Sequence, residues 1–264
     1  MFLIITNMLI SAGEIIKKSF ILYKENWKLL LKYVLLLATP IVIFSPLYLG
    51  MTATMIAGGT NRTLFIVYLA LFIIVALCSM WFSLALLRVI ATRYLGHEVQ
   101  SMKQELKTSK HLVFPFIGVY IVFSLIIFGG LLLLIVPAII WGVWYAFFTQ
   151  TVALDEKKGL DALKKSRELV TGRWWSVFWR ITAPAVVFMS MSLILQLVLN
   201  IPTLITESVG LLLAGFVLNI IANLLISPLS AIALTILFLE LKKTITTTPI
   251  EVIPPAQSME PPFV

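Results

Sequence analysis

Charged residues are scarce in this 264-residue sequence: Asp, Glu, Lys and Arg make up 12% of it, and hydrophobic residues make up 60%. A soluble domain is roughly 45–50% apolar and about 25% charged, and so few charges cannot cover so apolar a core. The sequence has one cysteine, Cys78, which cannot form an internal disulfide. Composition therefore excludes a soluble globular enzyme, a disordered chain and a disulfide-stapled secreted domain.

Residues that perform chemistry are also scarce. The sequence has two histidines and no phosphate-binding loop, dinucleotide fingerprint or zinc-ligand spacing. The nearest approach to a catalytic cluster is Gly96-His97-Glu98, which offers two ligands where a metal site needs three or four. The sequence therefore predicts a non-enzymatic protein with no catalytic residue, no metal site and no cofactor.

Long apolar runs are what the sequence contains instead. No water inside a bilayer can satisfy open backbone groups, so a spanning helix needs about 20 consecutive, mostly apolar residues. Six segments meet this requirement: Leu29–Leu49, Leu64–Arg88, Leu112–Leu132, Pro137–Leu154, Val177–Asn200 and Gly210–Leu239. The sequence thus predicts an all-α membrane protein with six transmembrane helices in one membrane domain, residues 1–243.

Glycine and proline interrupt two stretches of this domain. Between the third and fourth spans, Gly129, Gly130 and Pro137 indicate a tight hairpin, with the glycines in its turn. Inside the sixth span, Ser227-Pro228 removes a backbone hydrogen bond, and this predicts a kink in the helix.

The basic residues indicate which way the chain faces. The sequence carries 20 Lys and Arg against 12 Asp and Glu, a net charge of +8. All of the basic residues except Arg62 lie in or beside the N-terminal region, the second-to-third and fourth-to-fifth connections, or the C-terminal end. Because cytoplasmic loops carry the excess of Lys and Arg, we expect a multi-pass protein with both termini in the cytoplasm.

The two ends of the chain differ from the rest of it. Met1–Ile10 is apolar but has no basic segment and no small-residue cleavage site, so we expect an uncleaved N-terminus that dips into the membrane. Residues 244–264 are rich in threonine and proline, which suits an extended, disordered cytoplasmic tail.

The sequence contains an internal repeat at an offset of 147 residues. Ile16-Lys17-Lys18-Ser19 recurs as Leu163-Lys164-Lys165-Ser166, and Trp27 matches Trp174 at the same offset. The register then places the first span on the fifth and the second on the sixth, which makes the repeat parallel. Val99–Lys110 is a weaker third version, so we expect three units of one interfacial helix and two spans.

Each main copy opens with an amphipathic helix, the first over about residues 11–27 and the second over about residues 159–174. In the first, a Ser11-x-x-Glu14 capping box precedes an apolar face. That face consists of Ile16, Phe20, Tyr23 and Trp27. Such helices lie in the membrane interface, with lysines among anionic headgroups. The predicted contacts to lipid or to a partner are Lys17, Lys18, Trp27, Lys164, Lys165, Arg173, Trp174 and Trp175.

Two segments resemble a known family. An Ala-Leu-x-x-Ser-x-x-Leu-x-x-Gly-x-x-Trp pattern is carried by Ala162, Leu163, Ser166, Leu169, Gly172 and Trp175. Together with Gly13-Glu14 and Asn26-Trp27, it resembles the membrane domain of the glycerophosphoryl diester phosphodiesterase family, over about residues 10–243. Related prokaryotic membrane proteins share these motifs, which implies a prokaryotic cytoplasmic membrane.

The resemblance also bears on activity. In that family the membrane domain stands alone in some members and is fused in others to a cytoplasmic phosphodiesterase, a barrel with a His-Arg-Gly motif and a Glu-x-Asp metal pair. Neither motif occurs in this sequence. We therefore expect the membrane part alone.

Amide and hydroxyl side chains are costly inside a bilayer, so those within the spans are informative. Asn219, Asn223 and Ser227 recur every four residues on the sixth span, and Gln150 and Gln196 lie on the fourth and fifth. They predict hydrogen bonds between helices or, alternatively, a polar cavity.

Two functions stay open on this basis. In the first, the protein engages membrane lipid with anionic headgroups, or a partner protein or second copy, through its basic amphipathic helices; nucleic acid is not expected as a partner. In the alternative, it transports a small molecule or lipid along the polar face of the sixth span. That span has no Asp or Glu at mid-depth, where coupled carriers usually need a carboxylate.

A topology assay tests the predicted count of spans. A reporter fused at Gly59, in the first outer loop, should read as external, and one fused at Thr247 should read as internal. Paired fusions to alkaline phosphatase and green fluorescent protein measure the two outcomes. If both positions report the same side of the membrane, the six-span arrangement is wrong.

Overall fold

The computed structural model describes residues 9–56, 62–205 and 209–246, and every regular element within these ranges is a helix. In chain order the helices are α2 (Ala12–Glu25), α3 (Trp27–Ile56), α4 (Arg62–Tyr94), α5 (Met102–Lys110), α6 (Val113–Leu133), α7 (Ile135–Trp144), α8 (Phe148–Asp155), α9 (Gly159–Val170), α10 (Trp174–Ile205) and α11 (Val209–Thr246). Most of the predicted membrane-dipping N-terminus and C-terminal tail, including Thr247, lies outside the described residues, as does Gly59.

Six segments of the described chain are long and apolar enough to cross a membrane. They are Trp27–Thr54, Arg62–Tyr94, Val113–Leu133, Ile135–Asp155, Trp174–Ile201 and Val217–Ile245. The prediction of an all-helical protein with six candidate transmembrane segments is thereby confirmed.

The fourth of these segments is broken in the middle. α7 ends at Trp144 and α8 begins at Phe148, with a turn between them. The fourth span, expected as one helix over Pro137–Leu154, is therefore made of two. α11, in contrast, continues as a helix through Pro228, and the kink expected there stays a prediction.

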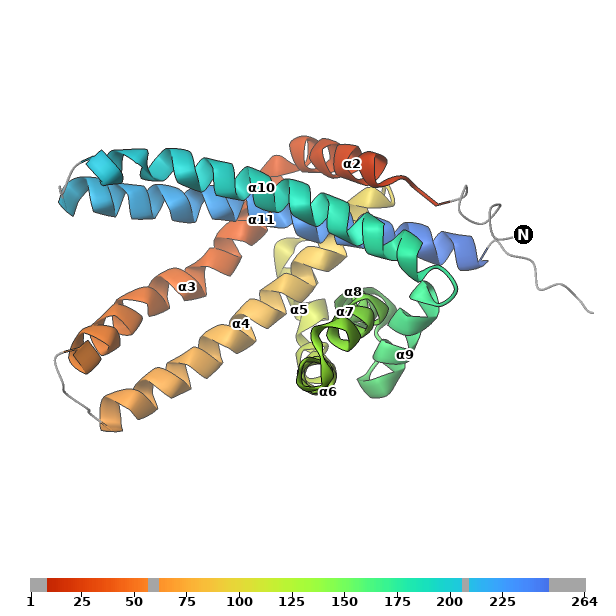
Figure 1. The fold of residues 1–264 in the computed structure, drawn as a ribbon, viewed down its shortest axis with the longest axis horizontal. Coiled ribbons are helices and arrows are strands. Elements are labelled where there is room, and N and C mark those ends of the chain that lie inside the picture. Colours follow the sequence, from red (N-terminus) through yellow and green to blue (C-terminus); the bar gives the residue numbers. More distant parts are fainter. Residues whose placement is uncertain (1–8, 57–61, 206–208, 247–264) are drawn as a thin grey trace, which may run out of the picture.

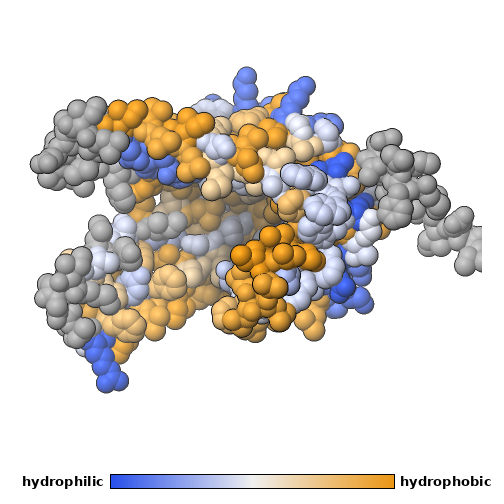
Figure 2. All heavy atoms as spheres, viewed as in Figure 1, coloured by the Kyte–Doolittle hydropathy of each residue, from blue (hydrophilic) through white to orange (hydrophobic). Residues whose placement is uncertain are grey.

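The long helices pair as three hairpins: α3 with α4, α6 with α7, and α10 with α11. Figure 1 shows these hairpins running in different directions from a shared region to which the short helices also belong. We call this region the hub. It is defined by buried side chains near one end of every hairpin, among them Tyr33, Ile90, Val119, Val177 and Ile236. Hydrophobic residues cover the arms that leave the hub, and hydrophilic residues gather at the hub end (Figure 2).

The short helices α2, α5 and α9 pack into the hub through matching positions. The buried residues at matching positions are Ile15, Ser19 and Leu22 in α2, Glu105 and Ser109 in α5 with Leu112 just after it, and Ala162, Ser166 and Leu169 in α9, which also buries Leu163 and Val170. Phe20 and Trp27, from the apolar face expected to meet lipid, are exposed, and that face stays a prediction; Ser19, on the side toward the hub, is fully buried. A small serine side chain lets α2 approach α10 and α11 closely.

Helix starts recur at constant spacings. α2 and α3 begin at Ala12 and Trp27, and α9 and α10 begin 147 residues later, at Gly159 and Trp174. α5 begins at Met102, 90 residues after α2. The three buried serines keep these same spacings.

The hairpin of α6 and α7 reverses at Leu134 rather than at a glycine. Gly129 and Gly130 lie within α6, and Leu134 joins the two helices in an extended conformation. A Cβ atom on Gly130 would lie 2.9 Å from the Ala138 Cα and 2.9 Å from the Trp141 Cε3. The expectation that the glycines form the turn is therefore wrong: Gly130 is needed because α7 touches α6 at that point.

Gly130→Ala should destabilise the protein, because the new Cβ meets backbone atoms of α7. Overpacking of this kind costs about 1–3 kcal/mol. Gly129→Ala is the matched control, since nothing lies within 4 Å of a Cβ there and alanine favours a helix. Thermal unfolding in detergent measures both variants, and equal melting temperatures would contradict this contact.

Candidate functional site

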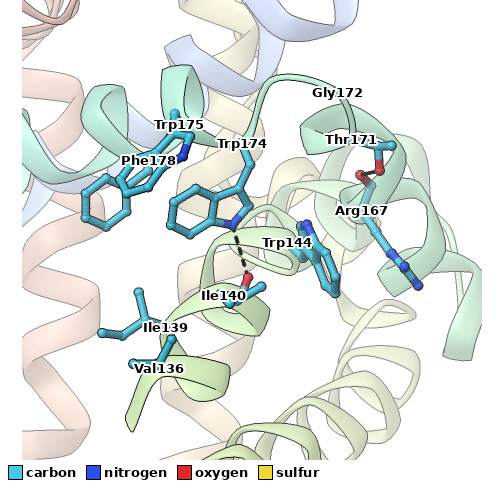
Figure 3. A pocket seen from close by; sticks show the side chains of 10 residues that line it. All are labelled: Val136, Ile139, Ile140, Trp144, Arg167, Thr171, Gly172, Trp174, Trp175 and Phe178. Atoms are coloured by element: carbon cyan, nitrogen blue, oxygen red, sulfur yellow. Dashed lines mark hydrogen bonds between the residues drawn. The ribbon is translucent and has the colours of Figure 1, made fainter.

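A pocket of about 690 Å³ lies between α7, the end of α9 and the start of α10 (Figure 3). α7 contributes Val136, Ile139, Ile140 and Trp144; α9 and the turn after it contribute Arg167, Thr171 and Gly172; α10 contributes Trp174, Trp175 and Phe178. This volume falls within the range of roughly 300–1,000 Å³ that is usual for small-molecule sites. The lining is mostly apolar and aromatic, with Arg167 as its charged residue.

The α10 side of the pocket is an aromatic wall. The rings of Trp174 and Phe178 are stacked, with centroids 5.2 Å apart and 9° between their planes. Trp175 packs edge-on against Trp174 at 4.8 Å. Trp174 Nε1 also donates a hydrogen bond of 3.3 Å to the carbonyl oxygen of Ile140, which joins α10 to α7. The wall is therefore held in place by bonds of the protein itself.

Arg167 supplies a cation at the edge of this pocket. The guanidinium carbon lies 4.4 Å from the centroid of the Trp144 ring, an arrangement worth about 0.5–1 kcal/mol at an exposed site. Within the described chain no carboxylate pairs with Arg167. Since a guanidinium presents its donors as a planar fork that fits phosphate or carboxylate, this group is able to bind an anion.

The residues that carry the family resemblance build this corner. Ala162, Leu163, Ser166 and Leu169 are buried in the hub. Gly172 has a φ of +79°, a left-handed conformation that suits glycine and turns the chain from α9 into α10. Trp175, in contrast, exposes 68% of its surface and lines the pocket.

Arg173 lies away from the pocket, although the sequence suggested a lipid contact. Its Nε donates to the carbonyl of Leu169 at 2.8 Å, Nη1 to Thr244 Oγ1 at 2.6 Å, and Nη2 to the carbonyl of Leu241 at 3.3 Å. Burial lowers the pKa of Arg173 below its ordinary value. The side chain therefore ties the end of α9 to the end of α11.

The lysines predicted as contacts lie outside the buried faces of the short helices. Lys17 and Lys164 are exposed, and Lys18 and Lys165 each pair at 3.3 Å with a glutamate of their own helix. Trp27, half exposed on α3, does not line the pocket. Of the predicted contacts, the structure thus brings Trp174 and Trp175 into the pocket, next to an arginine that the sequence did not single out.

The amide side chains of α10 and α11 bond to one another. Gln196 Nε2 donates to Asn223 Oδ1 at 3.3 Å, and Asn219 Nδ2 donates to Asn200 Oδ1 at 3.0 Å. Ser227 Oγ donates to a carbonyl of its own helix at 3.3 Å. Each such bond within a membrane contributes about 0.6–2 kcal/mol. This arrangement matches the first of the two predictions, hydrogen bonding between helices.

Residues 111–248 match a family described as Domain of unknown function (DUF7847), and the match covers more than half of the chain. The protein belongs to the DUF7847 family. The matched segment contains α6 to α11, and with them every residue that lines the pocket. No curated protein and no solved structure matches the chain.

A polar group in the hub joins the DUF7847 segment to the helices that precede it. Arg88 Nε lies 3.7 Å from Glu105 Oε2, and Arg88 Nη1 lies 3.2 Å from both Glu156 Oε1 and the carbonyl oxygen of Ala153. Gln150, predicted as a cavity residue, is buried on α8, and its Oε1 has no hydrogen-bond partner among the described residues. No group of three His, Cys, Asp or Glu side chains in the described ranges could hold a metal ion. Sequence reasoning missed these pairs, which carry no local signal.

Arg173→Gln should lower the melting temperature of the DUF7847 protein in detergent. Each charged hydrogen bond lost contributes about 1.5–3 kcal/mol, and the carbonyls of Leu169 and Leu241 lose a donor. Lys157→Gln is the matched control, because it removes one exposed positive charge near the start of α9. If the two variants melt at the same temperature, Arg173 does not tie α9 to α11.

Proposed function

We propose that this protein is a non-enzymatic integral membrane protein that binds membrane lipid at the cytoplasmic face of a prokaryotic cytoplasmic membrane. The pocket between α7, α9 and α10 carries the proposal, because it joins apolar walls to a cation without a carboxylate partner in the described chain. Tryptophan favours the membrane interface, where its ring meets hydrocarbon and its polar edge meets water. Trp175, exposed in the same pocket as Arg167, suits that position.

In this proposal the hub faces the cytoplasm, as do both termini. The lysines of α2, α5 and α9 belong to the hub end, whereas Arg62 opens α4 at the far end of its hairpin. Such an uneven distribution follows the positive-inside rule. The hairpins, with apolar side chains over their surfaces, then extend into the bilayer (Figure 2).

We further propose that α2–α4, α5–α8 and α9–α11 are three copies of one unit, an interfacial amphipathic helix followed by a hairpin. The constant spacing of the starts of α2, α3, α5, α9 and α10 supports this reading. So do the buried Ser19, Ser109 and Ser166, one in each short helix. In each copy the face opposite the serine carries lysines, which places basic groups around the hub where anionic headgroups would lie.

Relatedness to the membrane domain of the glycerophosphoryl diester phosphodiesterase family stays a hypothesis. Its support is that each motif residue has a defined structural place. Ala162, Leu163, Ser166 and Leu169 are buried, Gly172 forms the turn, and Trp175 lines the pocket. Transport along α11 has weaker support, because the amides that suggested a pathway are bonded across α10 and α11.

Reversing two charges on α9 tests the proposed function. Lys164→Glu combined with Lys165→Glu should reduce the retention of anionic lipid severalfold, because each basic residue near an anionic surface contributes about 1 kcal/mol. Lys164→Arg with Lys165→Arg is the matched control, since it keeps both charges. The measurement is the ratio of phosphatidylglycerol to phosphatidylcholine that stays with the protein after purification from an equal mixture. Equal ratios for the two double variants would refute the proposal.

A further inference from the structure

We propose that the pocket between α7, α9 and α10 holds one acyl chain of a phospholipid whose phosphodiester is bound by Arg167. The inference rests on the proposed lipid-binding function and assigns that function to one pocket and to the phosphodiester of the headgroup. Its support comes from the extent of the pocket lining along α7, from the aromatic wall, and from the lack of an oxygen partner for Arg167 in the described chain.

The α7 part of the pocket lining extends from Val136 to Trp144. Trp144 lies against Arg167, and Val136 lies eight residues earlier in the chain, about 12 Å away at 1.5 Å per residue. Ile139 and Ile140 line the stretch between these two ends (Figure 3). An apolar pocket with a cation at one end and a lining that continues for about two helical turns suits a lipid, with the headgroup at the cation and the chain along α7.

The walls are formed before any ligand binds. Trp174 is stacked on Phe178 and hydrogen-bonded to the carbonyl of Ile140, so its ring is fixed against α7. Trp175 is held edge-on to Phe178 at 5.8 Å and keeps most of its surface free. An apolar ligand therefore meets rigid rings and gives up little entropy of the protein on binding.

Arg167 differs from the two arginines that follow it. Arg173 is bonded to backbone and side-chain oxygens of α9 and α11. Arg180 donates to the carbonyl of Ile10 at 2.6 Å and to that of Ser176 at 2.8 Å. The guanidinium of Arg167 lies on the face of Trp144 and bonds to no oxygen in the described part of the chain. Stacking engages the face of the guanidinium and leaves the N–H donors at its edge without an oxygen partner in the described chain.

A phosphodiester is the group that best matches this edge. Its two non-bridging oxygens accept two parallel N–H bonds from one guanidinium. The glutamate that follows on α9, Glu168, is paired with Lys165 and does not compete for the cation. Phospholipid is also the solvent of the apolar arms, so the ligand is present wherever the protein resides.

Native mass spectrometry of the full chain in detergent, with phosphatidylethanolamine or diacylglycerol of the same chains added, tests the assignment. Arg167→Ala should lower retention of phosphatidylethanolamine about tenfold and leave that of diacylglycerol unchanged, because diacylglycerol has no phosphate. Lys157→Ala is the matched control: it removes an exposed cation just before the same helix and outside the pocket lining, and should change neither. Equal effects of the two substitutions, or loss of diacylglycerol in Arg167→Ala, would overturn the proposal.

A second variant tests the chain while Arg167 stays intact. Ile139→Trp fills the pocket at a partly exposed position and should reduce retention of both lipids. Leu160→Trp adds the same ring to an exposed position of α9 outside the lining and should reduce neither. Full retention by Ile139→Trp with an unchanged melting temperature would also overturn the assignment. The broader lipid-binding function is tested separately, by the preference for phosphatidylglycerol that depends on Lys164 and Lys165. Phosphatidylethanolamine is zwitterionic, so its retention does not measure that preference.

Discussion

The hydroxyl group of Ser166 determines the shape of the candidate site. A break in a helix frees backbone groups, and in a bilayer no water is present to satisfy them. Ser166 Oγ accepts a hydrogen bond of 3.1 Å from the N–H of Phe147 and donates one of 3.0 Å to the carbonyl of Trp144. These two residues border the break between α7 and α8, so one side chain of α9 both stabilises the break and fixes α9 against α7.

The same constraint explains why the hairpins meet at the hub. In a bilayer, lipid would compete for apolar contacts along the arms, so apolar burial alone would give little preference for one helix neighbour over another. At the hub, polar bonds supply that preference: Arg88 joins α4 to Glu105 and Glu156, and Tyr94 Oη donates to Glu240 Oε1 at 2.7 Å. Within the arms each hairpin uses its own chemistry, amides between α10 and α11 and aromatic contacts such as Phe44–Tyr68 between α3 and α4.

How much of this could be predicted depends on the range of the interaction. The six spans follow from local composition, because a bilayer admits few alternatives to an apolar helix of sufficient length. Trp174 and Trp175 could be identified because tryptophan beside basic residues is typical of an interface. Gly130 was misread, since a glycine ahead of a proline suggests a turn whereas the structure uses its missing Cβ.

The three arginines of this region mark where prediction from the sequence ends. In the sequence, Arg167, Arg173 and Arg180 are alike, each a basic residue close to the start of the fifth span. Their difference arises from contacts with residues 9–10 and 241–244, at the two ends of the described chain. No pattern within a window of twenty residues carries that information, so the arginine left without an oxygen partner could be recognised only in the fold.

The apolar arms and the pocket beside Arg167 would differ in how they select lipid. In a bilayer every apolar arm would touch acyl chains, so an apolar pocket alone would confer no preference for one lipid over another. Selectivity between lipids would have to come from contacts with the headgroup, at the depth where a fixed charge lies next to the apolar pocket. In the proposed arrangement α9 places Arg167 at that depth; Ser166 joins α9 to the break in the fourth span, and Arg173 joins it to α11. The bonds that hold the hub together are therefore also the bonds that set the position of the proposed headgroup contact.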